Sequence, residues 1–169
     1  NAIRLSVKQF ADKNNLSYFD IRNQEGLLRN LMIRTSSTND LMVLVQFYEK
    51  DEKNIQLLME HLKTSFPEIT SLLYVINQKA NNTMYDQEVI CYDGKDHIME
   101  EMDGLYFKVG GKSFFQTNSE QARILYRKTK ELAKITENDL VYDLYTGTGT
   151  IAQYVATTAK KVVGIDSVE

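Results

Sequence analysis

The residues with the clearest chemical potential form a glycine turn near the end of the sequence. Residues 146–150 read T-G-T-G-T, and Gly147 and Gly149 permit a tight turn whose bare backbone a ligand can approach closely. Asp143 precedes this turn, where its carboxylate either braces the turn or meets a cationic group of a ligand. A second carboxylate, Asp166, follows the next apolar run. Together these residues predict a ligand-binding turn.

The turn lies between elements that form a β-α-β pattern. Residues 140–145 are apolar, with β-branched and aromatic side chains, which is typical of a strand buried on both faces. Residues 151–158 have a helical composition, and residues 161–166 form a second strand that ends in Asp166. In the opening unit of a doubly wound nucleotide-binding domain, an acidic residue at this place accepts hydrogen bonds from ribose hydroxyls. The pattern therefore predicts an adenosine-containing ligand, and the alternative is a β-α-β unit without one.

A second motif lies upstream of the turn. Residues 113–118 read S-F-F-Q-T-N, and D-L-Y-x-G-x-G-T follows at residues 143–150. This combination resembles the RNA uracil-C5 methyltransferases, enzymes that use S-adenosylmethionine to form 5-methyluridine in ribosomal and transfer RNA. The resemblance is close over residues 112–169 and loose before them. It implies an RNA partner, with 23S ribosomal RNA favoured over transfer RNA, although no residue here selects between them.

The resemblance also implies roles for single residues. Gln116 matches a glutamine that contacts the methyl donor and borders the target base, although it could instead cap the next helix. Tyr145 and Thr150 match residues that line the donor pocket, although Tyr145 could instead face the core. Asp166 matches the acidic residue that holds the ribose, and Thr146 stands where many relatives carry cysteine or serine. The expected S-adenosylmethionine-binding set is Gln116, Asp143, Tyr145, Gly147, Gly149, Thr150 and Asp166.

The family's catalytic groups do not occur in the sequence. The resemblance implies a cysteine thiolate in a Ser-Cys-Asn-Pro motif that attacks C6 of uracil, and a glutamate that removes the C5 proton. Neither these nor an Asp-Pro-Pro-Arg motif occurs here, so we expect no catalytic residue in this chain and no methylation by it alone. Cys91 lies in a strand pattern and is expected to be buried and unreactive. With one cysteine and two widely spaced histidines, His61 and His97, we expect no metal site.

Composition restricts the class of protein. The chain has 169 residues, 43% of them apolar and 25% charged, which is ordinary for a globular protein. Its net charge of −3 argues against a stand-alone nucleic-acid-binding module. No apolar run spans a membrane, and the lone cysteine fits a reducing compartment, so we expect a cytoplasmic protein. Because the sequence starts without methionine and stops after the second strand, we expect a fragment of a longer protein of undetermined oligomeric state.

The pattern predicts two domains of an α/β protein. Residues 1–110 are expected to form a small α+β domain on the substrate side, and residues 111–169 the incomplete start of a Rossmann-like class I methyltransferase domain. The expected helices are a short one ending at residue 12, then 51–65 and 117–134; the expected strands before residue 140 are 27–36, 41–49, 71–77, 88–92, 105–109 and 113–115. Thr117 and Glu120 form a capping-box pattern at the start of the third helix.

Two other functional classes stay open. One is a nicotinamide-dependent oxidoreductase, because Ala152 occupies the third-glycine position of the G-x-G-x-x-G fingerprint, which also accepts alanine. This class leaves the S-F-F-Q-T-N motif without a role. The other is a non-catalytic RNA or protein interaction module that keeps the fold without the chemistry.

Overall fold

A computed structural model of the chain describes residues 1–167, and these divide into two compact units. Unit 1 consists of Asn1–Ile98 with Gly110–Lys112, and unit 2 consists of Met99–Val109 with the chain from Ser113 onward. The predicted domain boundary after residue 110 therefore falls inside Gly110–Lys112, the short segment of unit 1 that interrupts unit 2. The assignment of residues 1–110 to the substrate side and of residues 111–169 to the methyl donor stays a prediction.

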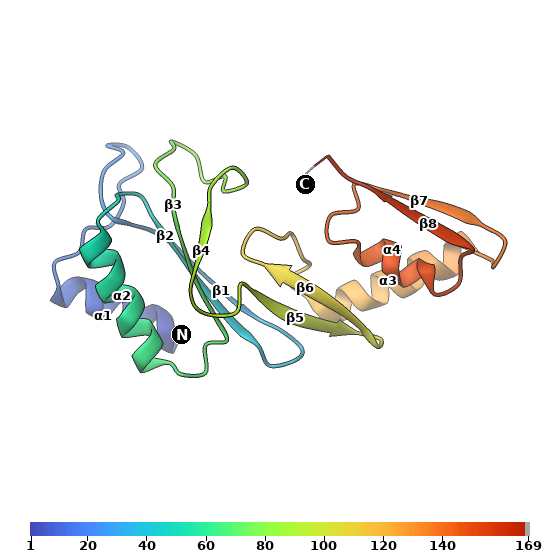
Figure 1. The fold of residues 1–169 in the computed structure, drawn as a ribbon, viewed down its shortest axis with the longest axis horizontal. Helices are drawn as coiled ribbons and strands as arrows, with labels where there is room; N and C mark the ends of the chain where they lie inside the picture. Colours follow the sequence, from blue (N-terminus) through green and yellow to red (C-terminus); the bar gives the residue numbers. More distant parts are fainter. Residues whose placement is uncertain (168–169) are drawn as a thin grey trace. The chain divides into compact units, whose positions relative to one another are not determined.

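Unit 1 is a mixed four-stranded sheet with two helices (Figure 1). Its elements are α1 (Ala2–Lys13), β1 (Leu28–Thr35), β2 (Leu41–Phe47), α2 (Glu52–Ser65), β3 (Ser71–Ile76) and β4 (Val89–Gly94). The strand order is β1-β2-β3-β4. Only β2 and β3 run parallel, and α2 is the crossover that this pairing requires. The predicted α+β pattern is confirmed for this unit.

The core of unit 1 lies between the helices and the sheet. The predicted apolar stripe of α2 is buried, and it packs with α1 and the sheet in one cluster; the stripe consists of Ile55, Leu58, Met59 and Leu62. The Asp51 side chain caps α2 by accepting a hydrogen bond from the Asn54 amide at 3.1 Å. Helical periodicity located this element because the same spacing decides which side chains are buried.

His61 makes the packing of α1 against α2 sensitive to pH. Its Nε2 lies 2.8 Å from the Ser6 hydroxyl, and its ring stacks on Phe10 with centroids 4.5 Å apart. Burial, assisted by the charge of Lys13, lowers the pKa of His61. The folded state therefore favours the neutral ring. This stabilisation is complete above the unfolded-state pKa of about 6.5 and is lost as the pH falls below it.

We therefore expect the urea midpoint of unit 1 to fall when the pH is lowered from about 7.5 to about 5.5. In a His61→Gln variant, which cannot bind the proton, the fall should be smaller. An equal fall in both proteins would assign the pH dependence to other groups.

Unit 2 combines a two-stranded sheet with the predicted β-α-β unit. Its elements are β5 (His97–Met102, whose first two residues belong to unit 1), β6 (Leu105–Gly110), α3 (Ser119–Ala133), β7 (Leu140–Leu144), α4 (Thr150–Ala156) and β8 (Lys161–Ile165). Buried side chains of the β5–β6 pair, α3 and α4 form its core, namely Met102, Phe107, Ala122, Tyr126 and Tyr154. This is a mixed α/β arrangement with the Rossmann-like unit that the sequence predicts.

Three local predictions for unit 2 are wrong. The cap of α3 is Asn118, whose side chain accepts from the Gln121 amide at 3.0 Å, so the cap lies one residue beyond the predicted Thr117. Residues 113–115 form no strand. The strand β7 is not buried on both faces, since Leu140, Tyr142 and Leu144 are all more than half exposed. Among the described residues β7 pairs only with β8, and this two-stranded sheet packs against α4.

No helix within residues 1–167 combines the length and the apolar character needed to cross a membrane.

Candidate functional site

Parallel pairing of β7 and β8 brings the glycine turn and Asp166 to one edge of the sheet. The register joins Leu140 to Lys161 at one end and Leu144 to Ile165 at the other. Because the two strands run in the same direction, the turn after β7 and Asp166 after β8 lie at the same edge. Ligands of open α/β sheets bind outside the carboxyl ends of the strands, so this edge is the candidate site.

Asp143 braces the turn from inside. Its Oδ2 accepts a hydrogen bond from the Thr146 hydroxyl at 2.7 Å and another from the Ala152 amide at 3.0 Å. Ala152 lies in the first turn of α4, where backbone amides have no partner within the helix. The carboxylate thus links the strand, the turn and the helix. The sequence left two roles open for Asp143, bracing the turn or contacting a ligand. These two hydrogen bonds brace the turn, and the contact with a ligand stays a prediction.

Asp166 holds the other side of the turn. Its Oδ2 accepts a hydrogen bond from the Gly147 amide at 2.7 Å. Beside it, the Thr146 amide donates to the Ile165 carbonyl at 3.1 Å. The turn is therefore tied to the ends of both strands.

The backbone of the turn is left-handed at three positions. Tyr145, Gly147 and Gly149 have φ values of 62°, 54° and 74°. A Cβ atom on Gly147 would meet nothing within 4 Å, so this glycine supplies conformation and leaves open space over the backbone. The Tyr145 side chain is 87% exposed, and the alternative that it faces the core is wrong. A non-glycine residue in this conformation is uncommon and marks a turn held by its surroundings.

Thr146 is a site residue whose importance the sequence reasoning underestimated. Besides its bond to Asp143, its side chain packs on Gly164 of β8, where a Cβ atom would lie 2.9 Å from Oγ1 and 3.0 Å from Cγ2 of the threonine. The available signal was the glycine inside an otherwise β-branched strand, which often marks the close approach of another group. Thr146 and Gly164 together fix the distance between the turn and β8.

Thr150, where the turn passes into α4, and Gln116 are not part of the open surface of the turn. Thr150 is 7% exposed, and its hydroxyl lies 2.9 Å from that of Thr148. It also hydrogen-bonds Tyr126, whose pKa is raised by burial and, to a smaller extent, by the charge of Asp143; the Thr150 bond opposes this rise. Gln116 is exposed in the segment before α3. The structure therefore brings Asp143, the two glycines and Asp166 together, and the assignments of Gln116 and Thr150 as ligand contacts stay predictions.

Relatives are found over nearly the whole chain, while no family model matches it. An uncharacterized RNA methyltransferase of Porphyromonas gingivalis is 54% identical over 168 residues, which are 98% of this chain and 36% of that protein. Another, of Bacteroides thetaiotaomicron, is 53% identical over 99% of this chain and 38% of that protein. The chain is homologous to a segment of RNA methyltransferases. It spans little more than a third of the length of these curated relatives.

Solved structures agree with this homology. The Pyrococcus abyssi tRNA (uracil-54, C5)-methyltransferase, in complex with S-adenosyl-L-homocysteine, matches 96% of this chain and 38% of its own with a TM-score of 0.74 and 30% identity. The Methanocaldococcus jannaschii tRNA m1G37 methyltransferase matches 96% of this chain and 45% of its own, with a TM-score of 0.51 and 18% identity, which shows the fold alone. The chain has the Rossmann-like methyltransferase fold.

Cys91 lacks the features of an activated thiolate. The expectation that it is buried is wrong, because it is a free and exposed cysteine. Partial burial of the thiol, followed by the charges of Asp96 and Asp93, raises its pKa, which is opposite to the shift that activates a nucleophile. Within residues 1–167 no group of three or more histidine, cysteine, aspartate or glutamate side chains could hold a metal ion.

Proposed function

We propose that the full-length protein transfers a methyl group from S-adenosylmethionine to C5 of a uridine in RNA. In this proposal residues 1–110 supply a substrate-side domain and residues 111–169 the first part of the donor-binding domain. The observation that carries it is the glycine turn held between the carboxylates of Asp143 and Asp166. Over 96% of its length the chain is 30% identical to a tRNA (uracil-54, C5)-methyltransferase whose structure contains S-adenosyl-L-homocysteine.

The residues of the turn fit an adenosine-containing donor. A carboxylate oxygen pair accepts several hydrogen bonds, so Asp166 can hold ribose hydroxyls while it also holds the Gly147 amide. The open space over Gly147 admits the ligand, and the exposed Tyr145 ring supplies apolar surface beside it. Gln116 is assigned to the reactive end of the donor on the basis of the S-F-F-Q-T-N motif. When bound, S-adenosylmethionine supplies an electrophilic methyl group on its sulfonium.

We infer that residues 1–169 do not catalyse the transfer alone. Uracil C5 is a weak nucleophile, and the resembled enzymes activate it by adding a thiolate to C6. The Ser-Cys-Asn-Pro motif that carries this thiolate does not occur in the sequence, and the raised pKa of Cys91 argues against it as a substitute. The nucleophile and the base are therefore assigned to other parts of the full-length protein.

The test is a pair of measurements on the full-length protein. Titration calorimetry should show binding of S-adenosyl-L-homocysteine and none of NAD. Incubation of an unmodified RNA transcript with S-adenosylmethionine should produce 5-methyluridine, which nucleoside mass spectrometry identifies. NAD binding alone would favour the oxidoreductase, and binding of neither ligand would favour the interaction module.

The choice of RNA is a separate part of the proposal. The family resemblance favours 23S ribosomal RNA, whereas the similarity to the P. abyssi enzyme favours transfer RNA as the second candidate. Parallel assays with unmodified transcripts of both RNAs distinguish them. Methylation of the ribosomal transcript alone is the expected result, and methylation of the transfer RNA alone would correct it.

A further inference from the structure

The loop between β3 and β4, residues 77–88, is held by an arginine that the proposed donor site does not use. Arg29 of β1 reaches across unit 1 and donates to three backbone carbonyls of this loop, those of Asn77 at 2.7 Å, Lys79 at 2.6 Å and Asn81 at 2.8 Å. Its guanidinium also lies 4.5 Å from the centre of the Phe19 ring. One cation on the sheet thus fixes several peptide groups of an exposed loop.

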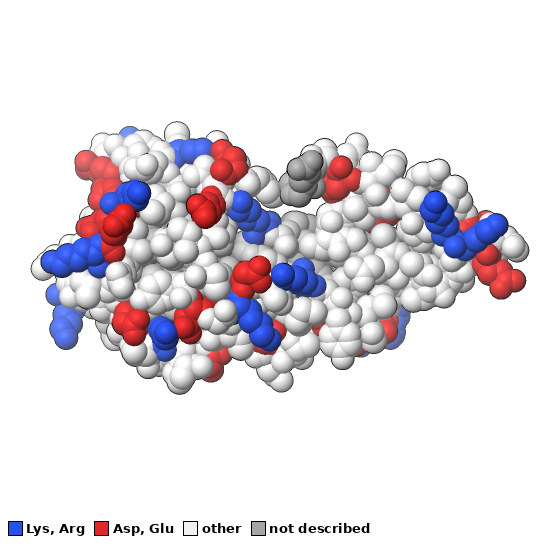
Figure 2. All heavy atoms as spheres, in the orientation of Figure 1, with Lys and Arg blue, Asp and Glu red and all other residues white. Residues whose placement is uncertain are grey.

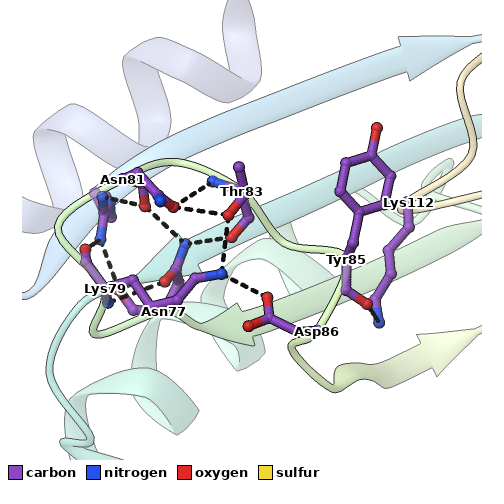
Figure 3. Close-up of polar contacts among 8 residues, drawn as sticks. Asn77, Lys79, Asn81, Thr83, Tyr85, Asp86 and Lys112 are labelled. Carbon is purple, nitrogen blue, oxygen red and sulfur yellow. Dashed lines mark hydrogen bonds and ion pairs between the residues drawn. The ribbon is translucent and has the colours of Figure 1, made fainter.

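Polar side chains close the loop from within (Figure 3). Asn77 is fully buried; its amide group donates to the carbonyls of Asn81 and Thr83, and its Oδ1 accepts from the Lys79 amide. The Lys79 ammonium bonds the Thr83 hydroxyl at 2.9 Å and the Asp86 carboxylate at 2.5 Å. Because its inward-facing polar groups have partners, the loop is held in one conformation without an apolar core of its own.

Tyr85 projects from this braced loop. Its side chain is 64% exposed, and its ring extends away from the Asn77–Lys79 network (Figure 3). The Lys112 ammonium donates to the Tyr85 carbonyl at 3.1 Å. Lys112 is positioned in turn by Gly111, which lies so close to β2 that a Cβ on it would be 2.7 Å from a Leu44 methyl group. Both groups belong to unit 1, so their arrangement depends on that unit alone.

An exposed aromatic ring, with an ammonium hydrogen-bonded to the backbone of the same residue, fits one nucleotide of a single strand. Isolated exposed aromatic residues are common and by themselves indicate nothing. Tyr85 differs because its backbone is already ordered, so stacking on it costs little conformational entropy. An ammonium has three donors, and one of those of Lys112 is directed at the Tyr85 carbonyl, which leaves donors for a phosphate. Acidic and basic side chains are interspersed on the face of unit 1 in Figure 2, which favours a local contact over a broad basic surface.

We propose that Tyr85 stacks on an unpaired base of the RNA substrate while Lys112 binds the adjoining phosphate, at a contact separate from the base that is methylated. This contact rests on the proposed function, because it gives that function a place where RNA is held. Stacking tolerates any base, so the contact contributes affinity and positioning more than sequence selection.

The test compares variants of the full-length protein on the RNA transcript that the wild type methylates. Tyr85→Ala should weaken RNA binding and raise the KM for RNA by about tenfold, the effect of losing one base stack, with unchanged affinity for S-adenosyl-L-homocysteine. Tyr85→Phe keeps the ring and should bind as the wild type does. Tyr106→Ala is the matched control, since Tyr106 is 62% exposed and lies on β6.

Lys112→Gln tests the phosphate contact. The logarithm of RNA affinity falls linearly with the logarithm of salt concentration, and the magnitude of this slope should decrease by about one in the variant, because one counterion fewer is released on binding.

The outcomes separate this contact from the proposed function. A wild-type protein that neither binds nor methylates RNA overturns both. A wild type that methylates RNA, with Tyr85→Ala and Lys112→Gln unchanged in affinity and salt dependence, overturns the contact alone and assigns the loop to a protein partner or to the scaffold. Equal losses in Tyr85→Ala and Tyr106→Ala would also overturn it, because the effect would not be specific to the braced loop.

Discussion

An Asp143→Ala variant of the full-length protein is expected to bind S-adenosyl-L-homocysteine at least about tenfold more weakly than the wild type. The variant loses the acceptor for the Thr146 hydroxyl and the Ala152 amide, which leaves the turn and the first turn of α4 without their common partner. Hydrogen bonds to a charged group contribute about 1.5–3 kcal/mol each, and about 1.4 kcal/mol corresponds to tenfold in affinity. Titration calorimetry measures the effect directly.

Asp139 supplies a matched control for this experiment. Its Oδ2 accepts from the amide and the hydroxyl of Thr136, at 2.6 and 2.8 Å, so it also combines an amide and a threonine hydroxyl. It lies just before β7, at the end of the strand opposite to the glycine turn. Asp139→Ala should leave the affinity for S-adenosyl-L-homocysteine unchanged. Equal affinities of the wild type and Asp143→Ala would show that the braced turn is not the donor site.

A Gly94→Ala substitution is expected to destabilise unit 1 by about 2–5 kcal/mol. This is the sum of the cost of placing alanine in a left-handed backbone conformation, about 1–2 kcal/mol, and the cost of overpacking, about 1–3 kcal/mol. Gly94 has φ +75°, and a Cβ there would lie 2.3 Å from the Thr70 carbonyl oxygen. Thr70 cannot move away easily, because its amide and its hydroxyl are both hydrogen-bonded to the backbone of Leu41. Urea unfolding, with hydrogen exchange of unit 1 amides, gives the loss of stability.

Gly104→Ala separates the two contributions to that loss. Gly104 has φ +80°, nearly the value of Gly94, but a Cβ there would meet nothing within 4 Å. Its substitution should cost unit 2 only the backbone contribution of about 1–2 kcal/mol. If both substitutions cost the same, the contact with Thr70 relaxes and the overpacking argument is wrong.

The sequence by itself determined those elements whose stability comes from near neighbours along the chain. The apolar stripe of α2 and the β-α-β unit around the glycine turn are local patterns, because helical and strand periodicities decide which side chains can be buried. The glycine positions of the turn also followed from local chemistry, since left-handed backbone favours glycine. Even here one predicted helix boundary was wrong. The N-cap of α3 is Asn118 and not the neighbouring Thr117, and the sequence could not distinguish them because asparagine and threonine are both favourable N-cap residues.

Only the tertiary structure decided which groups are partners across the chain. It joined Asp166 to Gly147 and placed Thr146 on Gly164, contacts that exist because β7 and β8 pair in one register. It also directed Arg29 to the loop at residues 77–88, about fifty positions away in the sequence. A sequence pattern records what each residue can do, whereas the partner of a carboxylate or a guanidinium depends on which segments the folded chain brings within hydrogen-bonding distance.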